Sequence, residues 1–337
     1  MFSFIKNRKV FYIFALVLMF VSLLLPWTLG VNQGIDMTGG VQIEYSVDGV
    51  SKSQVIKLAK SSLLQKAESS LPENISAIIT DKNIYGVSGV DSIIVETGID
   101  ESAAKTDDGS VDFTLVESAK QSFAAALQKE FNTIDQAQIK QTRYVNIGAS
   151  FGDYIKSSGY KSLIGVIIAI SLYILYAFRG SISGMVNWPF SVVTALTLFH
   201  DVIIAFGLYV LISFFFPEFK IDTFFITAML TVLGYSINDT IVVMDRIRSN
   251  LRDGHKKGHA FKKVIDESIH DTIRRSLFTS LTVLIVLLSM FFFGPDSIRG
   301  FTLALMLGTI VGTYSSICIA APLLYDMILS GNKKTKK

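Results

Sequence analysis

The residues of this 337-residue chain that could do chemistry are ionisable side chains inside long apolar runs. Asp239 lies in an apolar run over 221–244, among small and polar neighbours: Gly234, Ser236, Asn238 and Thr240. Placing a carboxylate at membrane depth costs about 2.5–3.5 kcal/mol on insertion scales, so such a residue is a functional hypothesis by default. Small and polar neighbours let helices approach closely and hydrogen-bond to one another. Asp239 is therefore the first candidate for a proton-carrying group.

A basic residue is expected near Asp239. Asp239 precedes Arg246, at the basic end of its run, by seven residues, which places it roughly 10 Å inside the cytoplasmic boundary. Arg275 lies at the start of the next apolar run, 276–293, which begins on the same side. A carboxylate that alternates between an arginine and a proton would form a proton relay. The alternative for Arg275 is a guanidinium that extends to the membrane interface.

A second pair of ionisable residues, His200 and Asp201, falls near the middle of the run over 188–216. Adjacent residues on a helix point about 100° apart, so the two side chains are not expected to share one face. One would face the helix bundle and the other would make a local hydrogen bond. A relay role and a structural polar contact both stay open for this pair.

The elements that must position these residues are six apolar runs, over 10–29, 162–178, 188–216, 221–244, 276–293 and 301–324. Each is near or above the roughly 18–20 residues that cross about 30 Å of hydrocarbon as a helix. The first run exceeds the 7–15 apolar residues of a signal-peptide core, so it is predicted to be a retained anchor. The sequence therefore predicts a polytopic α-helical membrane protein with six transmembrane helices.

Charge predicts the orientation and the domains. Lys and Arg gather at both termini and between the fourth and fifth runs, which marks these parts as cytoplasmic. The segment 30–158 holds 11 Lys and Arg against 17 Asp and Glu, and is expected outside. Four parts follow: 1–29 with the first span, the outer domain 30–158, the bundle of spans two to six over 159–328, and a basic tail over 329–337. The net charge of +3 divides between acidic and basic parts and predicts no nucleic-acid partner.

The outer segment has a readable order of elements. Strands are predicted over 41–47, 75–84, 92–97 and 137–147, and helices over 51–67 and 113–131. That β-α-β-β-α-β order indicates an α+β, ferredoxin-like extracytoplasmic domain between helices 1 and 2. The single cysteine, Cys318, rules out a disulfide within the chain, and metal-type Cys/His spacings are absent. No metal site and no cofactor are predicted.

Four short stretches resemble one known family. The string LGYSINDTIVVMDRIR over 233–248 resembles the fourth-span signature of the SecF family of protein-export membrane proteins. The stretch GIDMTGG over 34–40 is similar to that family's Gly-Ile-Asp-x-x-Gly-Gly element, with Met37 where Phe is commoner. His200-Asp201 matches its third-span pair, and RSLFTS over 275–280 matches the opening of its fifth span. The family element outside the first span thus consists of Gly34, Asp36, Gly39 and Gly40.

The resemblance implies a short relative of the resistance-nodulation-division transporters in the bacterial inner (plasma) membrane. Members pair with SecD beside the SecYEG channel and use the proton motive force to pull unfolded polypeptide outward through the lipid bilayer. The family's proton carrier falls on Asp239 and its basic partner on Arg275. Asn238, Thr240, His200 and Asp201 would then supply supporting polar contacts. The cytoplasmic loop over 250–270 is expected to vary freely.

Two other functions compete with this reading. A proton-driven small-molecule or lipid exporter of the same superfamily would usually carry twelve spans and two large outer domains. An intramembrane hydrolase could use His200 and Asp201, but no Gly-x-Ser-x-Gly or His-Glu-x-x-His motif accompanies them. The sequence therefore predicts a non-enzymatic protein without catalytic residues.

Overall fold

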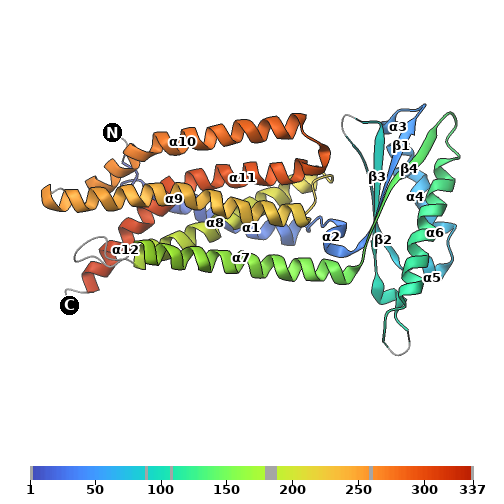
Figure 1. The fold of residues 1–337 in the computed structure, drawn as a ribbon, viewed down its shortest axis with the longest axis horizontal. Helices are drawn as coiled ribbons and strands as arrows, with labels where there is room; N and C mark the ends of the chain where they lie inside the picture. Colours follow the sequence, from blue (N-terminus) through green and yellow to red (C-terminus); the bar gives the residue numbers. More distant parts are fainter. Residues whose placement is uncertain (1–2, 88–89, 107–108, 179–187, 258–260, 335–337) are drawn as a thin grey trace. The chain divides into compact units, whose positions relative to one another are not determined.

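The computed structural model describes residues 3–87, 90–106, 109–178, 188–257 and 261–334 (Figure 1). Within these ranges, six helical segments are long and apolar enough to cross a membrane. They are α1 (Arg8–Leu29), α7 (Ala149–Ala177), α8 (Trp188–Phe215), α9 (Thr223–Lys257), α10 (Phe261–Phe293) and a continuous segment of α11 (Arg299–Ser315), η4 (Ser316–Ala320) and α12 (Ala321–Lys334). The predicted six-span architecture is confirmed.

The chain divides into two compact units. One comprises Met1–Asn32, Gly159–Lys220 and Phe224–Lys337, and the other comprises Gln33–Ser158 and Ile221–Thr223. The three residues Ile221–Thr223 join the second unit because Gln33 forms a parallel bridge with Ile221, and the Gly34 N–H donates to the Ile221 carbonyl at 2.9 Å. The segment that leads into α9 is thereby hydrogen-bonded to the chain that follows α1.

The second unit contains one antiparallel sheet of β1 (Gly40–Asp48), β2 (Ile79–Gly86), β3 (Ser92–Ile99) and β4 (Gln138–Ile147), in the order β2-β3-β1-β4. The helices are α3 (Lys52–Leu58), η1 (Ala59–Leu63), α4 (Leu64–Ser69), α5 (Glu73–Ser76) and α6 (Phe113–Phe131), with the short α2 (Ile35–Thr38) ahead of β1 and η2 (Glu101–Ala104) after β3. Alternate residues of β1 are buried, and Tyr45 meets Phe131 of α6 with ring centroids 4.9 Å apart. This is the predicted ferredoxin-like order.

Two local expectations are wrong. The strand predicted from residue 75 begins at Ile79, because Pro72 and Glu73 start the helical turn α5; proline and an acidic residue both favour a helix N-terminus. The loop expected over 250–270 is mostly helix, since α9 continues to Lys257 and α10 begins at Phe261. Polar contacts stabilise these two helix ends against each other: Arg246 pairs with Asp271 at 2.7 Å, and Asn250 donates to Ser268 at 3.0 Å.

The spans differ in how far they are enclosed. Half of the residues in the apolar windows of α8 and α9 are buried, and 61% in the segment containing α11 and α12, against 6% for α7. Helices α8, α9 and α11 therefore form the interior of the bundle. Asp201 and Asp239 both lie on these inner helices.

Candidate functional site

The site depends on a close contact between α9 and α11. A Cβ added to Gly308 would lie 2.2 Å from a methyl carbon of Val232, and one added to Gly312 would lie 2.9 Å from the Cβ of Ser236. Glycines four residues apart let membrane helices approach at backbone distance. This contact brings the hydroxyl-rich end of α11 beside the middle of α9, where Ser236 and Asp239 lie.

Asp239 is buried, with 4% of its surface exposed, in a network of hydroxyl groups from three helices. Ser280 of α10 donates to Asp239 Oδ2 at 3.3 Å. Ser280 in turn accepts from Tyr235 of α9 at 3.0 Å and from Thr313 of α11 at 2.6 Å. One serine oxygen thus connects all three helices to the carboxylate. A buried acid with such partners can exist charged or neutral, since hydroxyl groups both donate and accept.

The other residues expected around Asp239 lie in different surroundings. Arg275 is exposed on α10, and its positive charge interacts electrostatically with Asp239. Thr240 is buried, and its hydroxyl donates to the Ser236 carbonyl of its own helix at 3.1 Å. Asn238 is exposed on α9.

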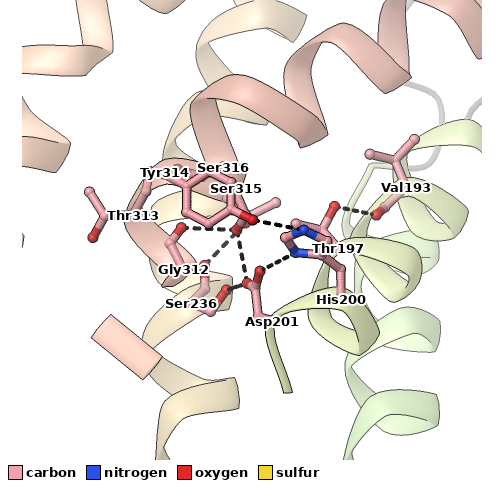
Figure 2. Close-up of polar contacts among 11 residues, drawn as sticks. Val193, Thr197, His200, Asp201, Ser236, Gly312, Thr313, Tyr314, Ser315 and Ser316 are labelled. Carbon is pink, nitrogen blue, oxygen red and sulfur yellow. Dashed lines mark hydrogen bonds and ion pairs between the residues drawn. The ribbon is translucent and has the colours of Figure 1, made fainter. Parts of the chain in front are cut away.

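His200 and Asp201 form a second buried network, shown in Figure 2. His200 Nδ1 lies 2.9 Å from Asp201 Oδ1, and His200 Nε2 lies 2.8 Å from the Tyr314 hydroxyl. Asp201 Oδ2 accepts hydrogen bonds from Ser236 and, at 2.9 Å, from Ser315. Asp201 is fully buried and His200 is 6% exposed. Three inner helices meet at this imidazole and carboxylate.

The expectation that His200 and Asp201 cannot share one face is therefore wrong. Their Cα–Cβ bonds diverge around α8, but both side chains bend into the space between α9 and α11 and bond to each other. Five residues of the two networks were missed: Tyr235, Ser280, Thr313, Tyr314 and Ser315. The signal available in the sequence was the run of hydroxyl residues over 313–316 within an apolar stretch, a composition typical of helix contacts in membranes.

The glycine-rich element outside the first span forms a tight connection inside the second unit. Gly39 and Gly40 have φ values of 74° and 147°, and a Cβ on Gly40 would lie 2.2 Å from the Thr97 carbonyl oxygen. A Cβ on Gly34 would lie 3.1 Å from the Cβ of Asp222. Asp36 is half-buried in the short helix between them. The positive φ values of Gly39 and Gly40, and the close approach of Gly40 to Thr97, require glycine.

No group of three or more His, Cys, Asp or Glu side chains in the described ranges is placed to hold a metal ion. The arrangement on α8, α9, α10 and α11 instead offers two buried carboxylates and an imidazole, each bonded to hydroxyl groups. Such groups inside a membrane bundle are typical of proton and ion pathways. Fold and site together define a polytopic membrane protein with a protonatable polar centre, a class that includes transport proteins.

Comparisons with known proteins place the chain within that class. The family described as "Protein export membrane protein SecD/SecF, C-terminal" matches residues 126–330. Protein translocase subunit SecF of Rhodothermus marinus is 32% identical, over 97% of this chain and 93% of that protein. The SecF subunit of Sebaldella termitidis is 33% identical, over 95% and 90% of the two chains. The chain therefore belongs to the SecF family of protein translocase subunits.

The fold has a counterpart among solved structures. The crystal structure of SecDF, a translocon-associated membrane protein from Thermus thermophilus, matches with a TM-score of 0.71 and 25% identity. The match covers 98% of this chain but 39% of the SecDF chain, so this chain spans well under half of that protein. The family consists of bacterial inner-membrane proteins named as translocase subunits, in agreement with the prediction of a non-enzymatic membrane protein.

Proposed function

We propose that this chain is the SecF subunit of a Sec export machine and that, together with SecD, it uses the proton motive force to drive late steps of polypeptide translocation through SecYEG. The observation that carries the proposal is the buried Asp239 carboxylate, which Ser280 contacts and on which the charge of Arg275 acts. In this proposal Asp239 binds and releases the proton. Arg275 stabilises the charged form, and its influence changes when the helices move.

Hydrogen-bond counting explains how a proton on Asp239 would act on helix packing. The Ser280 hydroxyl has one hydrogen, directed at Asp239, and two lone pairs, which accept from Tyr235 and Thr313. A proton on Asp239 Oδ2 would offer Ser280 a third donor. The bond from Thr313 would then have to reverse, and the Thr313 hydroxyl has a second acceptor for its hydrogen, the Thr309 carbonyl at 2.6 Å. Protonation of Asp239 is thus tied at a single serine to the direction of the hydrogen bonds that join three helices.

The exposed face of α9 has a composition that favours contact with a helix of SecD. Its exposed residues recur at steps of three and four along one face: Phe224, Thr227, Thr231, Gly234 and Asn238. An exposed amide at membrane depth is unfavourable against lipid, whereas small and polar residues favour close helix contacts. We assign this face to SecD, and through it the chain would join the SecYEG channel and the unfolded polypeptide. The termini and the tail over 329–337 would lie in the cytoplasm and the domain over 30–158 outside.

Gradient-driven export in reconstituted vesicles tests the proposal. The vesicles contain this chain, its SecD partner and the SecYEG channel, and late-stage export is measured with and without a proton gradient. Asp239→Asn is expected to abolish only the gradient-stimulated part, because asparagine keeps the shape but cannot exchange a proton. Asp245→Asn is the matched control on the same helix, since Asp245 is 58% exposed and pairs with Arg248. Unchanged stimulation in Asp239→Asn, with the complex assembled, would refute the proton-carrying role.

A further inference from the structure

The pair of His200 and Asp201, with Ser236, Tyr314 and Ser315 around it, has bonding partners for two protonation states. Both ring nitrogens of His200 are engaged, Nδ1 by Asp201 and Nε2 by the Tyr314 hydroxyl. In the neutral imidazole, Nδ1–H donates to Asp201 and Nε2 accepts from Tyr314. In the imidazolium, both N–H groups donate and the Tyr314 oxygen accepts. When Nε2 gains or loses a proton, rotation of the Tyr314 hydroxyl hydrogen is enough to keep both hydrogen bonds of the ring.

The charge of the His200–Asp201 pair also allows it to bind and release a proton. When His200 is an imidazolium and Asp201 a carboxylate, the pair is neutral overall. When His200 is a neutral imidazole, the pair keeps one negative charge in a site where Asp201 has no exposed surface. Burying an uncompensated charge is costly, but the Ser236 and Ser315 hydroxyls donate directly to Asp201 and reduce that cost. The protonated pair is therefore stabilised by its overall neutrality, and the deprotonated pair by the two serine hydroxyls.

The same two helix segments serve both this pair and Asp239. On α9, Ser236 bonds to Asp201, and Asp239 follows three residues later. On α11, Thr313 bonds to Ser280 of the Asp239 network, and the next two residues, Tyr314 and Ser315, bond to His200 and Asp201. A shift of either segment that changes one network must disturb the other.

The last span is irregular directly after the residues that join the two networks. Directly after Ser315, the α-helical pattern gives way to the π-helix η4 (Ser316–Ala320). Such segments are rare inside α-helices and are frequent at functional sites. The residues that join the two networks therefore lie where the register of the last span changes.

We propose that His200 is a second proton-exchanging group of the coupling machinery, and that its protonation is linked to that of Asp239 through Ser236 and the segment over 313–315. The proposal rests on the function proposed above for Asp239. His200 is thereby a positioning and proton-holding residue rather than a structural contact.

Other titratable groups near His200 are few. On the elements packed against it, the described groups in or beside the two networks are Asp201 of α8, Tyr235 and Asp239 of α9, Tyr314 of α11 and Cys318 of η4, which interacts with Tyr314. On α1, Phe14 contacts Tyr314, whereas the ionisable Arg8 and Tyr12 bond to Asp326 of α12. Asp239 is therefore the acid outside the pair that shares its supporting helix segments with His200.

Nitrogen NMR of the histidine side chains tests the link. The chain is labelled with ¹⁵N-histidine, combined with unlabelled SecD in lipid nanodiscs and titrated from pH 4 to 9. His200 is identified among the four histidines by the signal lost in His200→Gln. In Asp239→Asn the His200 signal is expected to change from its protonated to its neutral form at a lower pH than in wild type. The direction follows because the substitution removes a negative charge that favours imidazolium.

Two further variants keep the test decisive. Thr197→Val removes a hydroxyl that bonds only to the Val193 carbonyl of its own helix in Figure 2, and should leave the midpoint in place. Thr313→Val cuts the link to Ser280 and should reduce the shift caused by Asp239→Asn to less than half. A His200 signal that does not titrate, or a midpoint that is identical in wild type and Asp239→Asn, would overturn the proposal. Failure of the export function would appear separately, as gradient-driven export that survives Asp239→Asn.

Discussion

The contact between α9 and α11 can be tested with a pair of glycine substitutions. Gly308→Ala places a Cβ 2.2 Å from Val232, a distance that forces the two helices apart. Gly234→Ala is the matched control, because Gly234 also lies inside a membrane helix but has no atom of the described chain within 4 Å of the added Cβ. Both substitutions make the same chemical change, so their difference isolates the helix contact.

The expected difference follows from three contributions. Overpacking a close contact costs about 1–3 kcal/mol. Moving α11 away also weakens the bonds from Thr313 to Ser280 and from Ser315 to Asp201, each worth about 0.6 kcal/mol in a membrane protein. The gain in helix propensity from glycine to alanine, about 1 kcal/mol, is common to both variants and cancels. Gly308→Ala should therefore have a free energy of unfolding about 2–4 kcal/mol below that of Gly234→Ala.

The measurement is reversible unfolding of the isolated chain in detergent micelles, followed by tryptophan fluorescence. Gly234→Ala should stay within about 1 kcal/mol of wild type and should instead weaken assembly with SecD, because its Cβ projects from the exposed face of α9. Equal stabilities of the two variants would show that the Gly308 contact does not hold α11 against α9. The account of both polar networks would then lose its structural basis.

Two further predictions concern the outer domain. The Tyr45 hydroxyl is buried and finds no hydrogen-bond partner among the residues that the structure describes, so Tyr45→Phe should leave the free energy of unfolding unchanged or raise it by up to about 1 kcal/mol in denaturant titrations. Burial also raises the pKa of Tyr45 and of Tyr85. Since the folded pKa exceeds the unfolded value near pH 10, the stability that these neutral tyrosines contribute is complete below about pH 10 and declines as the pH rises further. Circular dichroism of alkaline unfolding should therefore show a midpoint at higher pH for Tyr45→Phe than for wild type, and an unchanged midpoint would contradict this assignment.

The two buried carboxylates of the bundle have similar kinds of partner. Asp239 is bonded to a hydroxyl and lies near an arginine, whereas Asp201 is bonded to two hydroxyls and a histidine. Each carboxylate thus has partners for its charged form. Ser236 of α9 and Ser315 of α11 bond to Asp201 directly. Ser280 of α10 bonds to Asp239 and is itself bonded to α9 and α11, so movement of α9 against α11 affects both carboxylates.

The sequence by itself determined the membrane architecture, because the length of an apolar run is a local property that the thickness of the bilayer fixes. It also determined the order of strands and helices in the outer domain, since alternation and helical periodicity are read within a dozen residues. Depth along a helix follows from counting residues, so Asp239 could be singled out without any tertiary information. The sequence did not predict the helical turn α5 after Pro72, the end of α9 or the start of α10. Short helical turns and polar helix ends depend on tertiary contacts, which hydrophobic periodicity does not record.

Only the tertiary structure decided which side chains surround the two carboxylates. Ser315 lies 114 residues from Asp201 in the sequence, and Ser280 lies 41 residues from Asp239. A hydrogen bond requires its two atoms to lie within about 3 Å, and that distance depends on where two helices cross. Here Gly308 and Gly312 set the crossing, by letting α11 approach the backbone of α9. Residue types along the chain could suggest that polar groups would meet. The partners of His200 and Asp201 are Ser236, Tyr314 and Ser315 because those residues lie where α11 crosses α9.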